Sequence, residues 1–247
     1  MKFFKTFYQF LYELHIPILS NLIKFIFWKL VDFYRWRTQP RKVHLYGIWC
    51  FVGVYGGGKT MSLVHYLERM RKKYGNKIII ATNFFYKNQD FAIETWKDLL
   101  PEYGKPVIFG YDELQNEFSS REYKGFPVDL MRMLTQNRKG HGKQIVYTTQ
   151  KYSTVDKQFR NQTTKVAKCK TFLGRFTRAC YYLAMDFEEL ENTTSVKGKM
   201  KIRPYFVDCF VQSDSMRELF DSYQFLESAK SKDYYGLGNP RETYDPF

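Results

Sequence analysis

The strongest constraint on the fold is a glycine-rich run that follows a short apolar stretch. Residues 43–52 read VHLYGIWCFV, and residues 53–60 read GVYGGGKT, the G-x-x-x-x-G-K-T pattern of a phosphate-binding P-loop. The glycines let consecutive backbone N–H groups face phosphates, Lys59 reaches the β- and γ-phosphates, and the Thr60 hydroxyl ligates Mg²⁺. We therefore assign nucleotide binding to the residues of this turn: Gly53, Gly56, Gly57, Gly58, Lys59, Thr60 and Met61.

The residues after the motif predict the helix that such a loop requires. A helix beginning here would direct its positive end at the phosphates. Leu63, Leu67, Met70 and Tyr74 recur at helical spacing, and Gly75 follows as a C-terminal cap. A strand before the loop and a helix after it predict a nucleotide site in an α/β fold.

A second strand supplies the carboxylates that nucleotide hydrolysis needs. Residues 106–113 read PVIFGYDE, an apolar run that ends in Asp112 and Glu113. We expect Asp112 to hold Mg²⁺ together with Thr60, and Glu113 to polarise the attacking water as a general base. The alternative is a strand end that simply turns into solvent. This pair predicts an ATPase with ATP and Mg²⁺ as its cofactors.

Other candidates for the site come from segments further along the chain. Residues 144–150 read QIVYTTQ, and Gln150 at the end of this strand is a candidate for sensing the γ-phosphate, a task that Thr148 and Thr149 could share. A helix over 127–139 ends in a basic, glycine-rich stretch. Arg138 in that stretch, or Arg160 beyond it, is a candidate arginine finger for a neighbouring subunit; both could equally be surface cations or contacts to DNA.

Basic and aromatic residues alternate in the last third of the chain. Strands are expected over 165–173, 179–187 and 201–211, with a polar surface loop at 188–199. Aromatic platforms between cations suit single-stranded DNA, whereas lysines can also simply guard a solvated sheet edge. Both readings stay open for this set: Lys165, Lys168, Lys170, Arg175, Arg178, Phe172, Phe176, Tyr181 and Tyr182.

The overall charge favours an anionic partner. With 39 Lys and Arg against 25 Asp and Glu, the formal net charge is +14, which suits nucleic acid or an acidic membrane face. The four His have no metal-ligand spacing. The four Cys have no disulfide or metal spacing either, so we expect all of them to be reduced core thiols: Cys50, Cys169, Cys180 and Cys209.

The first forty residues are rich in aromatic and basic side chains. Residues 3–14 carry an apolar stripe at helical spacing, and Pro17 suits the first turn of a second helix whose apolar face runs from Leu19 to Phe33. No stretch of about 20 residues is free of charge, which favours an interfacial helix or hairpin over a spanning one. The alternative is a helix pair packed on the globular domain or a neighbouring subunit. The predicted domains are 1–40, an ATPase domain at 41–228 and a polar tail at 229–247.

Four further motifs stand beyond the P-loop: DELQ at 112–115 with Phe118 and Arg121, LTQNRKGHG at 134–142, IVYTTQ at 145–150 and LFDSY at 219–223. Together they resemble the motifs of the zonular occludens toxin (Zot) family, the filamentous-phage assembly ATPases of the FtsK–HerA branch. Family membership implies a RecA-like fold with a mostly parallel sheet, a homo-oligomeric ring and location at the host inner membrane with the ATPase domain facing the cytoplasm. It also implies single-stranded DNA or a coated phage filament, and other phage assembly proteins, as partners.

The chain departs from the family pattern at both ends. About forty residues precede the P-loop strand. The family usually has a membrane span after the ATPase domain, and here a polar stretch ends at Phe247 without an apolar run. We expect the amino-terminal helices to replace that anchor.

Three functions follow from these observations. The first is a membrane-associated motor for virion assembly and export of single-stranded DNA. The second is a cytosolic viral packaging or plasmid translocase whose first forty residues dock on protein. The third is a nucleotide-gated scaffold without turnover, against which Glu113 speaks, since a pure switch needs no catalytic carboxylate.

Overall fold

The chain forms two compact units, Met1–Lys42 and Val43–Phe247. The computed structural model describes residues 17–38, 43–118, 127–195, 198 and 201–221. The helix predicted over residues 3–14, Arg121, Tyr223 and the tail at 229–247 lie outside these ranges.

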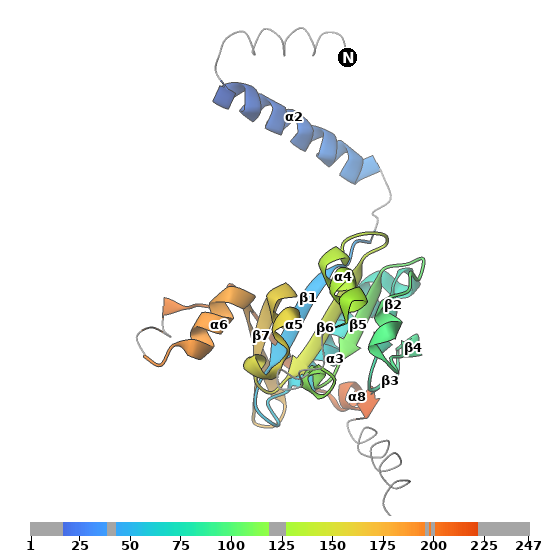
Figure 1. Ribbon diagram of the computed structural model, residues 1–247, viewed down its shortest axis with the longest axis vertical. Coiled ribbons are helices and arrows are strands. Elements are labelled where there is room, and N and C mark those ends of the chain that lie inside the picture. The colour runs from blue at the N-terminus through green and yellow to red at the C-terminus, as the bar shows by residue number, and fades with distance from the viewer. Residues whose placement is uncertain (1–16, 39–42, 119–126, 196–197, 199–200, 222–247) are drawn as a thin grey trace, which may run out of the picture. The chain divides into compact units, whose positions relative to one another are not determined.

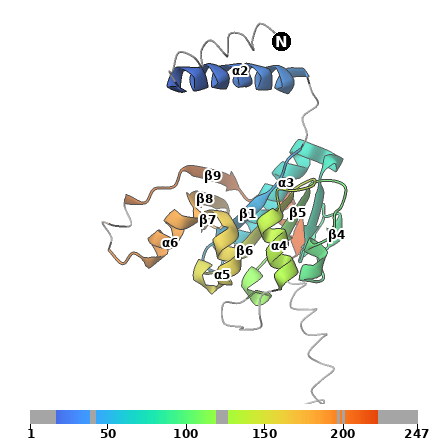
Figure 2. The ribbon, with the colours of Figure 1, turned by 45° about the horizontal axis from the view of Figure 1, so that its top comes forward.

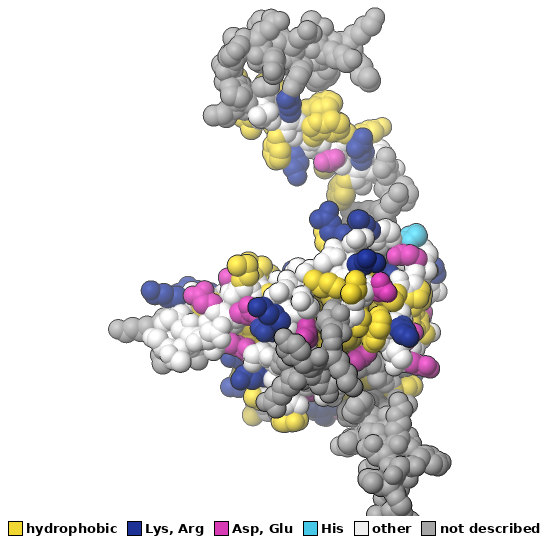
Figure 3. Space-filling view, in the orientation of Figure 1, with side chains coloured by type: hydrophobic (Ala, Val, Ile, Leu, Met, Phe, Trp, Pro, Cys, Tyr) yellow, Lys and Arg dark blue, Asp and Glu magenta, His cyan; other side chains and the backbone are white. Residues whose placement is uncertain are grey.

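The described part of the first unit is one long helix, α2 (Pro17–Thr38), which starts at the predicted proline. Its large apolar side chains stand exposed beside cationic ones, as the space-filling view shows (Figure 3). Among the described residues, no helix combines the length and the apolar character needed to cross a bilayer. The exposed apolar side chains include Leu22, Phe25, Ile26, Trp28, Leu30, Phe33 and Trp36.

The second unit is built on an eight-stranded sheet in the order β4-β2-β5-β6-β1-β7-β8-β9. Strands from β4 to β7 pair in parallel, and β8 and β9 add antiparallel strands at one side, which confirms the predicted mostly parallel sheet. Two short strands, β3 (Phe85–Tyr86) and β10 (Phe220–Asp221), form a separate antiparallel pair. The sheet strands are β1 (Gly47–Val52), β2 (Ile79–Thr82), β4 (Phe91–Ala92), β5 (Val107–Tyr111), β6 (Lys143–Thr149), β7 (Thr163–Phe172), β8 (Phe176–Leu183) and β9 (Phe206–Val211).

Helices cover both faces of this sheet (Figures 1 and 2). On one face α3 (Lys59–Tyr74) buries Leu63 and Leu67 against alternate residues of the strands. On the other face α4 (Val128–Gln136), α5 (Lys157–Gln162) and α6 (Ala184–Asn192) bury a second core. The alternating side chains of each strand supply both cores, so the sheet is the central layer of three. The shorter helical turns are α8 (Asp214–Arg217), η1 (Gly75–Lys77), η2 (Trp96–Leu99), η3 (Leu114–Asn116) and η4 (Tyr152–Thr154).

Three predicted strand boundaries are wrong by four residues or more, each for a local reason. The strand expected from residue 43 begins at Gly47, whose φ of 94° interrupts an extended chain before it. The strand expected to reach 187 ends at Leu183, because Phe187 and Leu190 follow at helical spacing and pack on the core as part of α6. The strand expected from 201 begins at Phe206, after Pro204, which cannot donate to a ladder.

The cysteines are only partly as predicted. Cys50, Cys169 and Cys180 are buried free thiols, and burial raises the pKa of Cys169 to about 12 and that of Cys50 well above its ordinary value. Cys209, however, is exposed, which corrects the expectation that it is a core residue. It lies on β9, the last strand of the sheet, where Phe206, Val207 and Val211 are exposed as well.

Candidate nucleotide-binding site

The P-loop connects the end of β1 to the start of α3 and lies against β7. Gly58 precedes the helix with a φ of 83°, and a Cβ there would collide with the side chain of Thr171. A Cβ on Gly53 would come within 2.8 Å of the Cys169 carbonyl oxygen. Side chains are therefore excluded at these two positions. The backbone of the loop packs directly against the sheet and leads into the N-terminus of α3. This is the cradle that a phosphate needs.

Lys59 points back into this cradle. Its side chain is 7% exposed, and its Nζ lies 3.4 Å from the Val54 carbonyl oxygen and 3.4 Å from Glu113 Oε1. A buried ammonium facing a loop of this form is placed to bind an anion, and Glu113 supplies the counter-charge.

Asp112 is fixed at the end of β5 by bonds from three other segments. Thr60 Oγ1 donates to Asp112 Oδ1 over 2.9 Å, and Thr148 Oγ1 donates to the same oxygen over 2.6 Å. The Asn83 side chain bonds both the N–H and the carbonyl of Asp112, at 2.7 and 3.1 Å. Burial raises the pKa of Asp112, while the two threonine hydrogen bonds oppose that shift. The Thr60 hydroxyl and this carboxylate thus meet as the two oxygen ligands of a Mg²⁺ site would.

Glu113 takes an unusual backbone conformation. It has a φ of 51°, in the left-handed region that is uncommon for residues other than glycine, and its N–H donates to Thr148 Oγ1 over 2.9 Å. Its carboxylate accepts a hydrogen bond from Gln115 Nε2 in addition to facing Lys59. The Gln115 Oε1 atom is buried without a partner among the described residues. Strained backbone of this kind concentrates at functional sites, and here it turns the carboxylate toward Lys59.

The remaining predicted site residues lie in different places. Met61 is buried in the first turn of α3, and Gln150 follows β6 and lines a cavity of about 560 Å³ beside Gly53. Arg138 precedes β6 at the opposite edge of the sheet, with its guanidinium 5.6 Å from the Tyr46 ring centre. Arg160 on α5 donates to Glu188 over 2.7 Å. The structure therefore does not bring either arginine to the phosphate cradle of its own chain, and a role toward a neighbour stays a prediction.

The sequence does not predict the contacts that two residues make with Asp112. Asn83 follows the apolar strand β2, and a polar residue at the carboxyl end of a parallel strand was the available signal. Thr148 is predicted only to share the sensing of the γ-phosphate with Gln150, whereas in the structure it contacts both Asp112 and Glu113. Its place opposite β5 depends on the parallel pairing of β5 with β6.

The residues present fit a nucleotide with Mg²⁺. A glycine turn that excludes Cβ atoms, a buried lysine at its centre and a threonine hydroxyl 2.9 Å from an aspartate are the donor set for phosphates and a hard cation. All of them lie where parallel strands end, the usual ligand edge of an α/β sheet. Fold and site together define a P-loop ATPase.

The chain belongs to the zonular occludens toxin (Zot) family, whose family model matches residues 66–217. No curated protein matches it. Among solved structures, it is similar to the N-terminal domain of zonular occludens toxin from Neisseria meningitidis, at 19% identity over 72% of this chain and 100% of that one, with a TM-score of 0.49. It is also similar to the genome packaging NTPase B204 from Sulfolobus turreted icosahedral virus 2, in complex with ATP-gammaS, at 15% identity over 68% and 97% of the two chains, with a TM-score of 0.43.

Proposed function

We propose that this chain is an ATP-driven motor that moves single-stranded DNA during phage virion assembly and export at the host cytoplasmic membrane, with its ATPase unit on the cytoplasmic side. The observation that carries the proposal is the meeting of Lys59, Thr60, Asp112 and Glu113 at one edge of the sheet. Glu113 adjoins the metal-ligand carboxylate, which is the position of a residue that activates water.

The proposed mechanism starts from the contact between Lys59 and Glu113. When ATP binds, Lys59 pairs with the γ-phosphate instead of with Glu113. Glu113 then accepts a proton from the attacking water, whose oxygen bonds to the γ-phosphorus while the bond from that phosphorus to ADP breaks. Gln115 limits the orientation of the Glu113 carboxylate. Thr60 and Asp112 would hold Mg²⁺, and the ion would neutralise charge on the phosphates. Gln150 reads the γ-phosphate, and Arg138 or Arg160 of a neighbour completes the site in a homo-oligomeric ring.

Membrane attachment is proposed for the first unit. The apolar residues of α2 are largely exposed, and Lys24, Lys29, Arg35 and Arg37 are interspersed with them. An amphipathic segment of this composition suits the interface of an anionic membrane, where each basic residue contributes about 1 kcal/mol. The same face could instead pack on a portal or another assembly protein in a cytosolic translocase, which is the second candidate.

The deciding experiment is steady-state ATP hydrolysis by the detergent-purified full chain, with and without single-stranded DNA, beside Glu113→Gln and Lys59→Ala. We expect Glu113→Gln to keep nucleotide binding and to lose hydrolysis by at least about 100-fold, and Lys59→Ala to lose tight binding. Glu117→Gln, an exposed carboxylate four residues on, is the matched control and should hydrolyse ATP like the unchanged protein. Equal turnover in Glu113→Gln would refute the assignment, and nucleotide binding without any turnover would favour the scaffold.

A further inference from the structure

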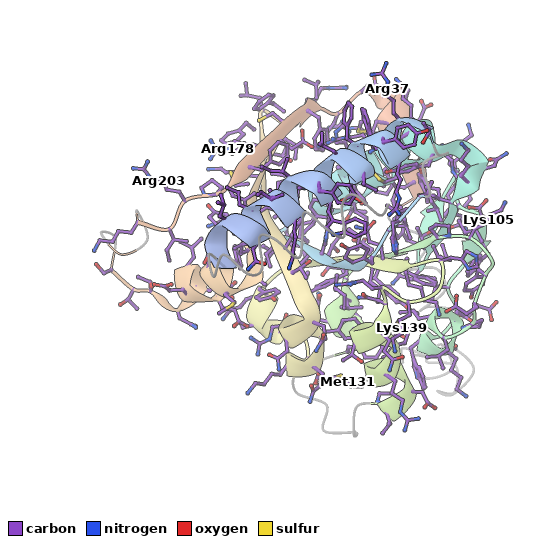
Figure 4. All side chains as sticks on the ribbon, turned by 90° about the horizontal axis from the view of Figure 1, so that it is seen from above. Arg37, Lys105, Met131, Lys139, Arg178 and Arg203 are labelled. Carbon is purple, nitrogen blue, oxygen red and sulfur yellow. The ribbon has the colours of Figure 1, made fainter. Side chains whose placement is uncertain are left out.

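A groove of about 600 Å³ lies on the α3 face of the sheet, away from the phosphate cradle. Its walls come from β1 and the segment before it, the middle and end of α3, the starts of β6, β7 and β9, and the end of β8. These places belong to the amino edge of the parallel strands, whereas the P-loop lies at their carboxyl edge. Figure 4 looks onto the amino edge, with Lys105 and Lys139 labelled on the loops that precede β5 and β6. We call it the aromatic groove, after its residues Tyr46, Trp49, Tyr74, Tyr181, Tyr205 and Phe206.

Several of its rings carry a cation. Lys165 Nζ lies 4.3 Å from the centre of the Trp49 ring, and Lys73 Nζ lies 4.9 Å from that of Tyr74. The Arg138 guanidinium is 5.6 Å from the centre of the Tyr46 ring. Each such pair places a positive charge beside a flat apolar surface. A ligand that carries both a flat ring and a negative charge can therefore stack on the aromatic ring while the cation neutralises its charge.

The charge of the groove has one sign. None of the described residues that line it is acidic, while Arg69, Lys73 and Lys165 all contribute to the lining. Asp208 contacts the rim, but it is bound to Arg69 over 2.6 Å. A second copy of this basic chain, or its own basic first unit, would add like charge here.

The exposure of the rings indicates the shape of the ligand. Tyr46 is 46% exposed, Tyr205 is 52% exposed and Phe206 is 49% exposed, so part of each side chain is accessible to a ligand. Trp49 and Tyr181 lie deeper, and Tyr181 is almost buried. A concave site with rings in its walls does not match a flat lipid surface, and a duplex hides the faces of its bases. Unpaired bases on a phosphate backbone fit both the rings and the cations.

We propose that the aromatic groove binds single-stranded DNA by stacking bases on Tyr46 and Tyr205 and by pairing phosphates with Lys73 and Lys165. The choice of DNA over RNA rests on the proposed function. The inference that the groove binds a single-stranded nucleic acid rests on its rings and cations alone. The helix α3 begins at the phosphate cradle and, being 16 residues or about 24 Å long, forms one wall of the groove with its second half. The two sites thus lie at opposite ends of one rigid element.

The test is fluorescence anisotropy of labelled oligo(dT) with the full chain in detergent and without nucleotide. Tyr46→Ala and Tyr205→Ala should each weaken binding roughly tenfold, the loss of one stacked base, and Tyr46→Phe should bind normally. Lys73→Gln should lower the salt dependence by about 0.7 in log–log slope. The matched controls are Lys72→Gln, one residue away on the same helix, and Phe85→Ala, an aromatic residue of β3 that is 44% exposed.

Ligand controls identify what the groove binds. A strand with the same sugar-phosphate backbone but no bases should bind more weakly, and Tyr46→Ala should not weaken its binding further. Binding of a duplex should also be unaffected by Tyr46→Ala. Oligo(rU) binding as tightly as oligo(dT) would contradict DNA as the ligand. Normal binding by the groove variants, or anionic vesicles whose binding depends on Tyr46, would overturn the proposal.

The experiments distinguish a failure of the groove proposal from a failure of the proposed motor function. If the groove variants bind DNA normally and DNA still stimulates ATP hydrolysis, the groove proposal fails and the motor stands. If DNA binding depends on the groove and hydrolysis is absent, the groove stands and the motor fails.

Discussion

At the scale of single residues, Asp112 is a buried carboxylate whose negative charge lowers the stability of the nucleotide-free protein. Its carboxylate is held by Thr60 and Thr148 in a place where burial disfavours its charge and raises its pKa. The charged form of this carboxylate is therefore less favourable in the folded protein than in the unfolded chain. Stability is greatest below the unfolded pKa and decreases as pH rises through the higher folded pKa. A bound cation would remove this penalty.

We expect Asp112→Asn to stabilise the nucleotide-free protein at neutral pH and to abolish Mg²⁺-dependent hydrolysis. The amide retains an oxygen for the two threonine hydroxyls and carries no charge to desolvate. Thermal unfolding in the absence of Mg²⁺ should show the gain at neutral pH and little difference at acid pH, where the carboxyl of the unchanged protein is protonated. A gain of equal size at both pH values would show that the carboxylate charge is not its cause.

Thr148 supports a second prediction, because its hydroxyl connects the two carboxylate residues. Thr148→Val keeps the shape of the side chain but removes the bonds to Asp112 Oδ1 and from the Glu113 N–H. We expect kcat to fall roughly tenfold with a smaller change in KM, because unmade buried hydrogen bonds cost about 1–3 kcal/mol and here they orient the reacting groups. Thr149→Val is the control, since the Thr149 hydroxyl bonds Lys151 and Thr154 instead. A loss of the same size in both variants would point to general damage of β6.

At the scale of elements, the pairing of strands decides which residues are accessible. The strand β9 ends the antiparallel extension of the sheet, where β8 is its only strand neighbour among the described residues, and most of its own residues are exposed. Parallel strands in the centre, by contrast, are covered by helices on both faces. Cysteines on the two kinds of strand should therefore differ in reactivity.

We expect a thiol reagent to modify Cys209 rapidly in the native protein and to leave Cys50 and Cys169 intact. Burial raises the pKa of both protected thiols, which also limits their thiolate fraction. Mass spectrometry after brief labelling with a maleimide measures this directly, and Cys209→Ser should remove the rapid phase. Rapid modification of Cys169 would mean that the P-loop, which packs on its backbone, opens in solution.

At the scale of the whole molecule, the nucleotide site and the proposed membrane contact lie in different units. The cores of the second unit are made by residues from Leu45 onward, and the described residues of its phosphate cradle lie between Gly53 and Thr148. The first unit carries the exposed apolar side chains of α2. Each unit can therefore be tested alone.

We expect a chain lacking residues 1–42 to fold and bind ATP but to lose binding to anionic vesicles. The matched variant keeps the segment and replaces Phe25 and Leu30 by Asp, which should weaken vesicle binding with little effect on unfolding temperature because both side chains are exposed. Vesicle flotation measures the outcome. Flotation of the truncated chain equal to that of the full chain would favour the cytosolic translocase.

The sequence by itself determined the parts of the site that depend on local order along the chain. The glycines, Lys59 and Thr60 are consecutive, and their chemistry follows from one turn leading into one helix. Asp112 and Glu113 were predictable because an apolar strand ends in them. Local order also predicted α2 from Pro17 and most strands of the sheet.

Only the tertiary structure decided what depends on neighbouring strands. Thr148 and Asn83 reach Asp112 because β6 and β2 flank β5, an order that the chain does not follow. The same order leaves Cys209 on an edge strand and gathers aromatic residues of five segments into one groove. Residues far apart in sequence meet through sheet pairing, and no periodicity within a single segment records which strands will be neighbours.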